Sequence, residues 1–590
     1  MPKIEVNSGI FYKLCGRSWK TKEEFVEALT CAKAELDSDF ITAEQPSVRP
    51  GSADESAMKI ELNDTNRPDL WSTAGCARQL RVYNNEKIPQ YGFFSSSGNS
   101  REARYRAFAE KSTGKVRPFL TGFVASGVTV TDPMLRDIIQ TQEKLAWNYG
   151  RKRRTVSMGI YRSEKIKWPI VYRAVDPASV SFVPLQWDSP LTPAEILKKH
   201  PKGKEYAFIL ENEPLHPLLL DSQNNILSYP PIINSADLGA VETGDSNLFV
   251  EFTGTDLASV ILATSIVACD MADSGFTIEP LEVEYENETP LGKKIVTPYY
   301  FQKPVFCSLA RIEKFLGKKL NAGECISALE RMGVNAEITE GSEQGSSVRE
   351  KGVTAKPPEY RNDYLHAADI GEDIMIGHGL HLFTPERPND FTVGRLQPLT
   401  LFCRQVKEIM TGLGYQEMIY NYLGSRRDYV EKMRSAGDRI IRIANPMTEN
   451  YEYVRDSILA SLMESESVSG HSVYPHRIFE TGKIAYLDDA DNSGSVSRLY
   501  LGFLFADREA NFNNAAAQIQ TLFYYLSREY SVAESSDPRF IAGRAASVMF
   551  QGKSIGVYGE IHPQVLENWG VTMPCIAAEI DIEALAVSEK

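Results

Sequence analysis

The sequence contains no hydrophobic run long enough to cross a membrane. Its most apolar stretch, LASVILATSIVAC at 257–269, holds thirteen residues, three of which carry hydroxyl groups. A membrane-spanning helix needs about 20 consecutive apolar residues. The first twenty residues also lack the continuous apolar core of a signal peptide. The apolar stretch therefore predicts a buried helix, and we expect a cytoplasmic protein with no membrane partner.

Cysteine and histidine are scarce, and the common enzyme motifs are missing. The 590 residues include eight cysteines, none of them in a CxxC pair, and eight histidines. Such sparse cysteines exclude a disulfide framework and indicate reduced thiols. The motifs GxxxxGKS/T, GxSxG and HExxH are all absent. His378 and His381 stand three apart in HGLH, a spacing more typical of packing or surface positions than of a metal site.

An excess of positive charge is also missing. The chain has 64 Lys and Arg against 78 Asp and Glu, which gives a net charge of -14. Because nucleic-acid phosphates are bound by Lys and Arg, this balance argues against a protein that wraps RNA or DNA over its whole surface. Two local basic stretches remain, at 101–117 and 150–154, and each fits an RNA contact as well as a solvated face.

The chain is long enough for several domains. Its 590 residues predict roughly three to five domains at about 150 residues each. Strand-like and helical patterns alternate over 100–275, and the C-terminal third suggests an antiparallel sheet with helices on one face. We therefore predict an α+β multidomain protein, with domains at 1–95, 100–275, 295–386 and 392–590.

The segment YRNDYLHAADIGEDIMIGHG, residues 360–379, crowds four carboxylates beside apolar positions: Asp363, Asp369, Glu372 and Asp373. The last three stand at i, i+3 and i+4, so they share one helix face, where like charges repel by roughly 0.2–0.5 kcal/mol per pair. One interpretation is the solvated face of an amphipathic helix. The other is a binding site for Mg²⁺ or Ca²⁺, which prefer oxygen ligands.

Several segments together resemble one family. They are, in chain order, KIELNDTNRPDLWSTAGCARQLR, LSYPPIIN with VEFTGTD, PPEYRNDYLHAADIGEDIMIGHG, ANPMTENYEYVRDSIL and GEIHPQVLENWG. In this order they are similar to the β subunit of phenylalanyl-tRNA synthetase, a class II aminoacyl-tRNA synthetase, in its shorter archaeal and eukaryotic form. The resemblance covers nearly the whole chain.

The resemblance implies four domains and a partner subunit. The domains would be a B1-like domain at 1–95, a B3/B4 editing domain at 100–275, a winged-helix-type B5 domain at 295–386, and a B6/B7 domain at 392–590 that copies the class II synthetase fold without its catalytic motifs. Activation of phenylalanine with ATP would belong to an α subunit, in an α2β2 heterotetramer that charges tRNA(Phe). RIFETGK (477–483) resembles but does not match the Arg-x-Glu motif of class II enzymes, which agrees with a noncatalytic domain.

An editing domain is needed because an apolar pocket for phenylalanine cannot strongly reject tyrosine, which merely adds a hydroxyl. A second site that recognises this hydroxyl would hydrolyse Tyr-tRNA(Phe). In archaeal members the editing pocket is lined by Leu, Ser, Asn, Asp and Thr, which align with Leu219, Ser228, Asn234, Glu251 and Thr253. Glu251 replaces the family's Asp. Its extra methylene either still places a carboxylate on the tyrosine hydroxyl or shrinks the pocket and weakens editing.

Other interpretations of the same residues remain open. Ser228 and Asn234 flank a Pro-Pro turn, where such side chains also satisfy local backbone groups. No nucleophile or general base is evident, so we name binding residues and no catalytic residue. If the pocket has lost editing, the chain is a scaffold subunit for assembly and tRNA positioning. A free-standing deacylase is a third interpretation, but it would leave the synthetase-like domain without a partner.

The resemblance also bears on the acidic segment. In bacterial relatives, acids at the positions of Asp363, Asp369, Glu372 and Asp373 bind Mg²⁺ at the interface with the α subunit, which favours the metal interpretation, with a structural role. Arg67, in the turn NDTNRPD, either reaches a phosphate or carboxylate of a ligand or pins its own loop. Asp69 is expected to cap the helix that follows, at about 72–83.

Overall fold

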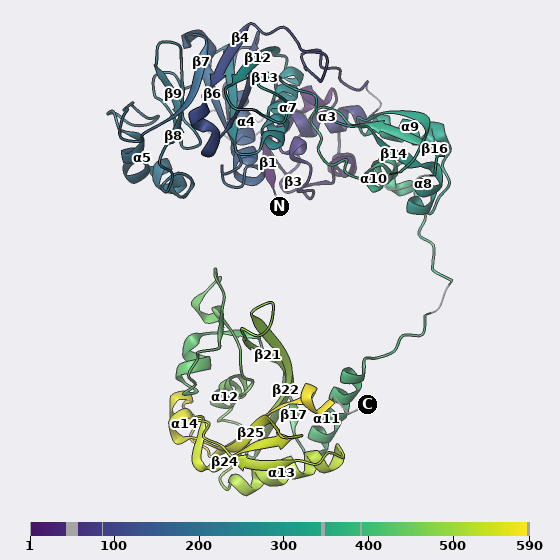
Figure 1. Ribbon diagram of the computed structural model, residues 1–590. Helices are drawn as coiled ribbons and strands as arrows, with labels where there is room; N and C mark the ends of the chain where they lie inside the picture. The colour runs from purple at the N-terminus through teal and green to yellow at the C-terminus, as the bar shows by residue number, and fades with distance from the viewer. Residues whose placement is uncertain (1, 43–56, 85–86, 344–347, 390–391, 587–590) are drawn as a thin grey trace. The chain divides into compact units, whose positions relative to one another are not determined.

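The structure is a computed structural model that describes residues 2–42, 57–84, 87–343, 348–389 and 392–586 (Figure 1). The chain divides into two compact units, Met1–Glu386 and Arg387–Lys590. Each unit has hydrophobic cores of its own. Within these described ranges, the first unit contains three sheets and the second contains two.

The chain begins with a small sheet in the order β1-β3-β2, covered by helices. Its elements are β1 (Lys3–Asn7), α1 (Ser8–Cys15), α2 (Lys22–Leu29), β2 (Ala34–Leu36), β3 (Ala57–Leu62) and α3 (Thr73–Tyr83). Ser72, rather than the predicted Asp69, caps α3, because its side chain accepts the backbone N–H of Gly75. Asp69 instead pairs with Arg67. The cap prediction was therefore wrong by three residues.

A ten-stranded sheet forms the body of the first unit, in the order β10-β9-β8-β7-β4-β12-β5-β11-β6, with β13 on β12. Its strands are β4 (Tyr105–Ala109), β5 (Phe119–Ser126), β6 (Val156–Arg162), β7 (Ile170–Val175), β8 (His216–Leu220), β9 (Ile226–Tyr229), β10 (Ile233–Asn234), β11 (Asn247–Gly254), β12 (Thr277–Tyr285) and β13 (Lys294–Thr297). The sheet extends past 275, where the sequence placed the end of this domain.

Four helices accompany this sheet: α4 (Asp132–Lys144), α5 (Pro193–Lys199), α6 (Pro201–Tyr206) and α7 (Leu257–Asp273). Helix α7 is the apolar stretch of the sequence. It packs on β5 and β11, and most of its side chains are buried, which confirms the predicted buried helix. Within the described ranges, no helix combines the length and the apolar character that a membrane span requires.

A third, three-stranded sheet closes the first unit, in the order β14-β16-β15. Its elements are β14 (Val305–Ser308), α8 (Leu309–Leu316), α9 (Ala322–Arg331), β15 (Asn335–Gly341), β16 (Glu350–Lys356) and α10 (Ala367–His378). Helix α10 carries three of the four acids of the acidic segment, and Asp363 lies just before it. Ile370 and Ile374, spaced one helical turn apart, are both fully buried in the core of this domain, as their spacing predicts.

The second unit is built on a seven-stranded sheet, in the order β17-β21-β22-β26-β25-β24-β23. All its neighbours are antiparallel except β17 and β21. Its strands are β17 (Gln416–Glu417), β21 (His476–Leu487), β22 (Ser495–Ala506), β23 (Ser531–Glu534), β24 (Phe540–Phe550), β25 (Lys553–Ile561) and β26 (Cys575–Asp581). A small sheet holds β18 (Leu423–Gly424), β19 (Ile441–Arg442) and β20 (Tyr453–Val454), and the helices are α11 (Pro398–Gly412), α12 (Leu459–Val468), α13 (Phe512–Tyr525), α14 (Pro563–Trp569) and α15 (Ile582–Ala586).

Helices cover both faces of this seven-stranded sheet, not one face as the sequence suggested. Phe503 of β22 packs in one core with Ile519 of α13. Leu504, the next residue of the same strand, packs in another core with Leu462 of α12. Because neighbouring strand residues point to opposite faces, apolar side chains at both positions bury both sides of the sheet. The expectation of one covered face was wrong for this reason.

Candidate functional site

Two of the five predicted editing residues, Asn234 and Glu251, line a cavity of about 350 Å³ in the first unit. The wall also includes side chains of α4 and β6 and the turn of Pro230 and Pro231. A cavity of this size falls at the low end of the roughly 300–1,000 Å³ that small-molecule sites occupy. The cavity can therefore hold a group the size of an amino-acid side chain.

The sheet register explains how distant parts of the chain reach this cavity. Leu219 of β8 lies opposite Ser228 of β9, and Ser228 lies opposite Asn234 of β10. These three residues therefore form one row across three strands. Glu251 comes from β11, whose neighbour β6 places Gly159 directly opposite it.

The phenol of Tyr161, on β6, brings the predicted residues together. Its oxygen lies 2.8 Å from Ser228 Oγ and 3.0 Å from Glu251 Oε1. Asn234 Oδ1 is 3.5 Å away, at the outer limit of a hydrogen bond. The side chains that were expected to read the hydroxyl of a substrate tyrosine thus surround a tyrosine of the protein itself.

Glu251 is the buried acid of this site. Burial raises its pKa to about 7, while the hydrogen bond from Tyr161 and the charge of Arg117 act in the opposite direction. Its Oε1 is bonded to Tyr161, but its Oε2 has no hydrogen-bond partner in the part of the chain that the structure describes. A buried polar atom without a partner costs free energy, so it marks a position where a ligand can be gained.

Thr253 and Leu219 lie behind the cavity rather than on its wall. Thr253 Oγ1 accepts from Arg117 Nε at 2.9 Å and lies 2.9 Å from Ser157 Oγ. Arg117 is fully buried, and burial lowers its pKa to about 10. Leu219 is also fully buried. These two predicted residues therefore support the wall from inside the sheet.

Sequence reasoning missed Tyr161, Gly159 and Arg117. The segment VSMGIYR, which forms β6, is buried at nearly every position, so it lacks the alternation that would single out one face. Gly159 is also needed here. A Cβ at this position would lie 2.3 Å from the Tyr161 hydroxyl oxygen and 2.5 Å from Glu251 Oε1. A glycine inside a strand is the signal that could have pointed to a close contact.

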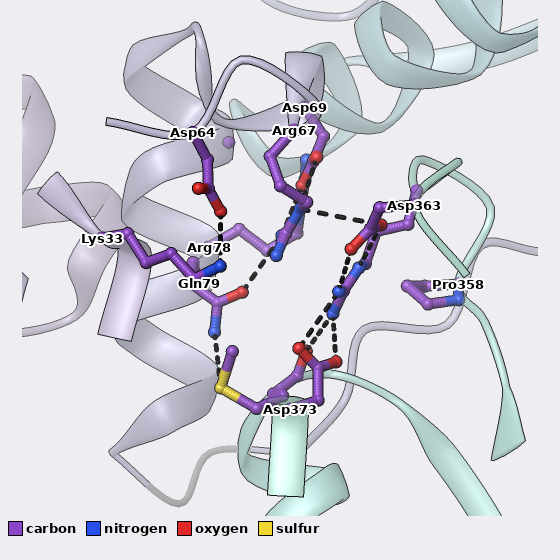
Figure 2. Close-up of polar contacts among 12 residues, drawn as sticks. Lys33, Asp64, Arg67, Asp69, Arg78, Gln79, Pro358, Asp363 and Asp373 are labelled. Atoms are coloured by element: carbon purple, nitrogen blue, oxygen red, sulfur yellow. Dashed lines mark hydrogen bonds and ion pairs between the residues drawn. The ribbon is translucent and has the colours of Figure 1, made fainter. Parts of the chain in front are cut away.

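The acidic segment has a different geometry. Asp363 and Asp373 both face the guanidinium of Arg361, which donates to Asp363 Oδ1 at 2.9 Å and to Asp373 Oδ2 at 2.6 Å. Arg361 is 1% exposed. Burial favours the neutral form of Asp363, but the guanidinium groups of Arg361 and Arg67 hold its pKa below the ordinary range. Figure 2 shows Asp363 and Arg67 together in this network.

The other two acids of the segment have partners of their own. Asp369 accepts the backbone N–H groups of Leu365 and His366 at the start of α10. Glu372 forms an ion pair with Lys33, which also pairs with Asp64 at 2.8 Å. The shared helix face that the spacing predicted is thus divided among three separate contacts.

As this chain presents them, the four carboxylates do not fit a magnesium site. A guanidinium already lies between Asp363 and Asp373, and Asp369 turns back toward its own helix end. Among the residues that the structure describes, no three His, Cys, Asp or Glu side chains are grouped to hold a metal ion. Magnesium binding with the help of a partner subunit stays a prediction.

Two further candidates prove to be structural. Arg67 is buried and donates to both carboxylate oxygens of Asp69, each at 2.8 Å, so it pins its own turn (Figure 2). In RIFETGK, Glu480 accepts from Arg455 at 2.7 and 2.9 Å, and both side chains are buried. Because its carboxylate is fully engaged by Arg455, Glu480 agrees with the noncatalytic interpretation of this segment.

Comparisons with known proteins now identify the family. Residues 305–380 match the family model described as tRNA synthetase B5 domain, and residues 386–582 match the model described as phenylalanyl tRNA synthetase beta chain CLM domain. A structure of an N-terminal fragment of the phenylalanyl-tRNA synthetase beta-subunit from Pyrococcus horikoshii is 34% identical, with a TM-score of 0.56. It matches 64% of this chain and 100% of that fragment.

Relatives that match over the full length of the chain carry the same family name. The phenylalanine–tRNA ligase beta subunits of Treponema pallidum subsp. pallidum and of Borrelia duttonii are each 42% identical, over 99% of this chain and 100% of theirs. These relatives are bacterial, so they do not bear out the narrower prediction of an archaeal or eukaryotic form. The chain belongs to the phenylalanine–tRNA ligase beta subunit family.

Proposed function

We propose that this chain is the β subunit of a cytoplasmic phenylalanine–tRNA ligase and that it hydrolyses Tyr-tRNA(Phe). In this proposal an α subunit charges tRNA(Phe) with phenylalanine at the expense of ATP, in an α2β2 assembly of the archaeal and eukaryotic type. The ten-stranded sheet is the B3/B4 editing domain, the region at 305–380 is a winged-helix-type B5 domain, and the second unit is a noncatalytic B6/B7 domain of the class II fold.

One observation carries the editing proposal. Glu251, a buried acid with one unpaired oxygen in the described chain, lines a cavity of about 350 Å³ together with Asn234. A site that offers a buried hydrogen-bonding group rejects the analogue that lacks the matching hydroxyl, because the group is then left unpaired. Phenylalanine is that analogue. The cavity therefore favours a tyrosyl group over a phenylalanyl group, which is the selectivity that editing requires.

Basic side chains of the same wall suit the rest of the substrate. Arg153 and Lys202 line the cavity. Arg153 Nη1 also donates to the backbone oxygens of Pro231 and Ile232, each at 3.1 Å, so it is held at the Pro-Pro turn. Cations at this edge fit the phosphates at the end of a tRNA. No residue here is assigned as nucleophile or base, and the proposal names binding residues only.

The proposed Mg²⁺ contributes no step to this function. The acids that would hold it are engaged by Arg361, Lys33 and backbone groups in this chain. Magnesium binding would need ligands from an α subunit, and the ion would then serve the assembly of the two subunits.

The experiment is hydrolysis of Tyr-tRNA(Phe) and Phe-tRNA(Phe) by the complex purified through a tag on this chain, with wild type and Asn234→Ala. Asn247→Ala, on the same strand as Glu251 but outside the cavity, is the matched control. We expect rapid hydrolysis of Tyr-tRNA(Phe) alone, slowed in Asn234→Ala and unchanged in the control. If the wild type is no faster than the uncatalysed reaction, the editing proposal fails and the chain serves only assembly and tRNA positioning.

A further inference from the structure

Building on the proposed function, we propose that Tyr161 is a positioning residue of the editing site. Its hydroxyl holds Glu251 through Oε1, so that Oε2 stays available for the hydroxyl of a phenolic aminoacyl ester. Tyr161 touches no reacting atom in this proposal. It contributes to the selectivity for tyrosine because it fixes which oxygen of Glu251 accepts the hydrogen bond from the substrate.

The position of the Tyr161 ring is fixed by packing. The residue is fully buried, and its ring stacks on Phe249 with centroids 5.7 Å apart. Trp168 in turn packs edge-on against Phe249, with centroids 5.2 Å apart. On the side of the hydroxyl lies Gly159, where a side-chain atom would find no room. We infer that a ring packed in this way keeps its position when a substrate binds, so it forms a fixed part of the site.

The hydrogen bonds of the phenol have a direction. A phenol has one proton to donate and can accept another. When it donates to Glu251 Oε1, 3.0 Å away, the hydroxyl of Ser228, 2.8 Å away, is left to donate to the phenol. Ser228, Tyr161 and Glu251 then form one chain of hydrogen bonds that ends on the carboxylate. This arrangement gives Ser228 a supporting role instead of the direct substrate contact that the family alignment implies.

The unpaired oxygen makes the site specific for a hydroxyl. Because Tyr161 occupies Oε1, Glu251 has one oxygen left, and this Oε2 is the atom without a partner in the described chain. Asn234 shares the cavity wall, and its amide nitrogen is already bonded to the backbone oxygens of Ile160 and Gly239. Oε2 is therefore the oxygen of Glu251 that is left to accept a substrate hydroxyl, and because this atom is itself buried, the substrate must displace wall atoms to reach it.

Hydrolysis of Tyr-tRNA(Phe) should also depend on pH. The titratable and charged groups nearest Glu251 are Tyr161 on β6, Arg117 before β5 and Tyr172 on β7. The cavity wall adds Glu143, Arg153 and Lys202. With a pKa of about 7, Glu251 is protonated in mild acid and accepts best when ionised, so hydrolysis should rise as pH increases through neutrality. Removing the donated hydrogen bond raises the pKa further, so the rise should move to higher pH.

The test uses Tyr161→Phe, which removes the hydroxyl and keeps the ring. The complex of the full chain with its α subunit is assayed for single-turnover hydrolysis of Tyr-tRNA(Phe) across the neutral pH range. The matched control is Tyr285→Phe, which removes another buried hydroxyl of the same sheet, one that donates to the backbone oxygen of Leu120. Glu251→Gln, which cannot ionise, is measured beside them.

We expect Tyr161→Phe to lower kcat/KM for Tyr-tRNA(Phe) by roughly 10- to 100-fold at neutral pH, the loss typical of a hydrogen bond to a charged group. Its pH profile should shift upward, Tyr285→Phe should keep the wild-type profile, and Glu251→Gln should lose the pH dependence. If Tyr161→Phe matches Tyr285→Phe in rate and profile, the positioning role is overturned while editing stands. If the wild type itself does not hydrolyse Tyr-tRNA(Phe), the proposed function fails first.

Discussion

The acidic segment at 360–379 and the Glu251 cavity both bury carboxylates, yet they differ in how these groups are satisfied. Asp363, Asp373, Asp369 and Glu372 all have a cation or a backbone N–H as partner. Glu251 shares its cavity with Glu143 and leaves one oxygen unpaired in the described chain. A group of neighbouring acids is therefore a weaker sign of a binding site than a buried acid whose oxygen lacks a hydrogen-bond partner.

The energetics of the two regions differ for the same reason. In the acidic segment, Arg361 compensates two buried carboxylates at once, and Arg67 adds a second guanidinium 4.0 Å from Asp363. Burying such groups costs more than it returns unless every partner is present. The contacts of Arg67 and Lys33 therefore tie the N-terminal sheet to the B5 region, whereas the Glu251 cavity keeps a buried oxygen without a partner in the described chain.

Loss of Arg361 should destabilise the protein more than any other substitution considered for the acidic segment. Arg361→Ala leaves Asp363 and Asp373 buried without their guanidinium, which should lower the free energy of unfolding by about 3–5 kcal/mol. Urea unfolding of the chain measures it. The control is Arg311→Ala, which breaks an ion pair with Glu343 at a side chain that is 46% exposed and should cost about 1 kcal/mol or less. Equal losses in the two variants would contradict the compensated network.

A side chain at Gly159 should destabilise the protein less, because it crowds only the Tyr161 and Glu251 side chains. Gly159→Ala places a methyl group against both the Tyr161 hydroxyl and Glu251 Oε1. The overpacking should cost about 1–3 kcal/mol and slow the hydrolysis of Tyr-tRNA(Phe). Gly92→Ala meets open space, and its change should stay within about 0.5 kcal/mol. A tolerated Gly159→Ala with full hydrolysis would mean that the hydroxyl and the carboxylate can separate without harm.

The exposed part of the acidic segment should matter less. Glu372→Gln removes the ion pair with Lys33, and the Glu372 side chain is 46% exposed. The expected loss in the free energy of unfolding is about 0–1 kcal/mol, and it should shrink in high salt because solvent ions screen the pair. A loss as large as that of Arg361→Ala would show that Glu372 belongs to the buried network.

Removal of metal ions should change the stability of the chain least. Because Arg361, Lys33 and backbone groups already partner the four acids, EDTA should leave the thermal unfolding temperature of this chain by itself unchanged. Differential scanning calorimetry with and without EDTA measures it. The conclusion that these acids form no metal site by themselves would be contradicted if EDTA lowered the unfolding temperature and Mg²⁺ restored it in wild type but not in Asp369→Ala.

Part of the site could be predicted from the sequence, because short turns fix short-range geometry. The Pro-Pro turn between Ser228 and Asn234 makes these residues neighbours across β9 and β10. The resemblance to the family added Glu251. Tyr161 could not be found in the same way, because its contact with Ser228 spans 67 residues of chain and depends on the order of strands in the sheet.

In the acidic segment, the sequence predicted which residues are buried but not which partners the acids would have. Helical spacing correctly placed Ile370 and Ile374 in the core, since burial follows the period of the helix. The same spacing could not predict that Asp369 would turn back to the start of α10, nor that Glu372 would meet Lys33, 339 residues away. The partner of Asp363, however, stood two residues earlier in YRND as Arg361, so the sequence already contained a competitor for the metal.

We propose that Glu251 accepts a hydrogen bond from the hydroxyl of a mischarged tyrosine. The most direct test compares hydrolysis of Tyr-tRNA(Phe) and Phe-tRNA(Phe) by the wild-type complex, Glu251→Gln and Glu284→Gln, an exposed acid on β12 of the same sheet. We expect Glu251→Gln alone to lose about tenfold or more of the rate on Tyr-tRNA(Phe), with no change on Phe-tRNA(Phe). A Glu251→Gln complex that keeps the wild-type preference for tyrosine would contradict this proposal.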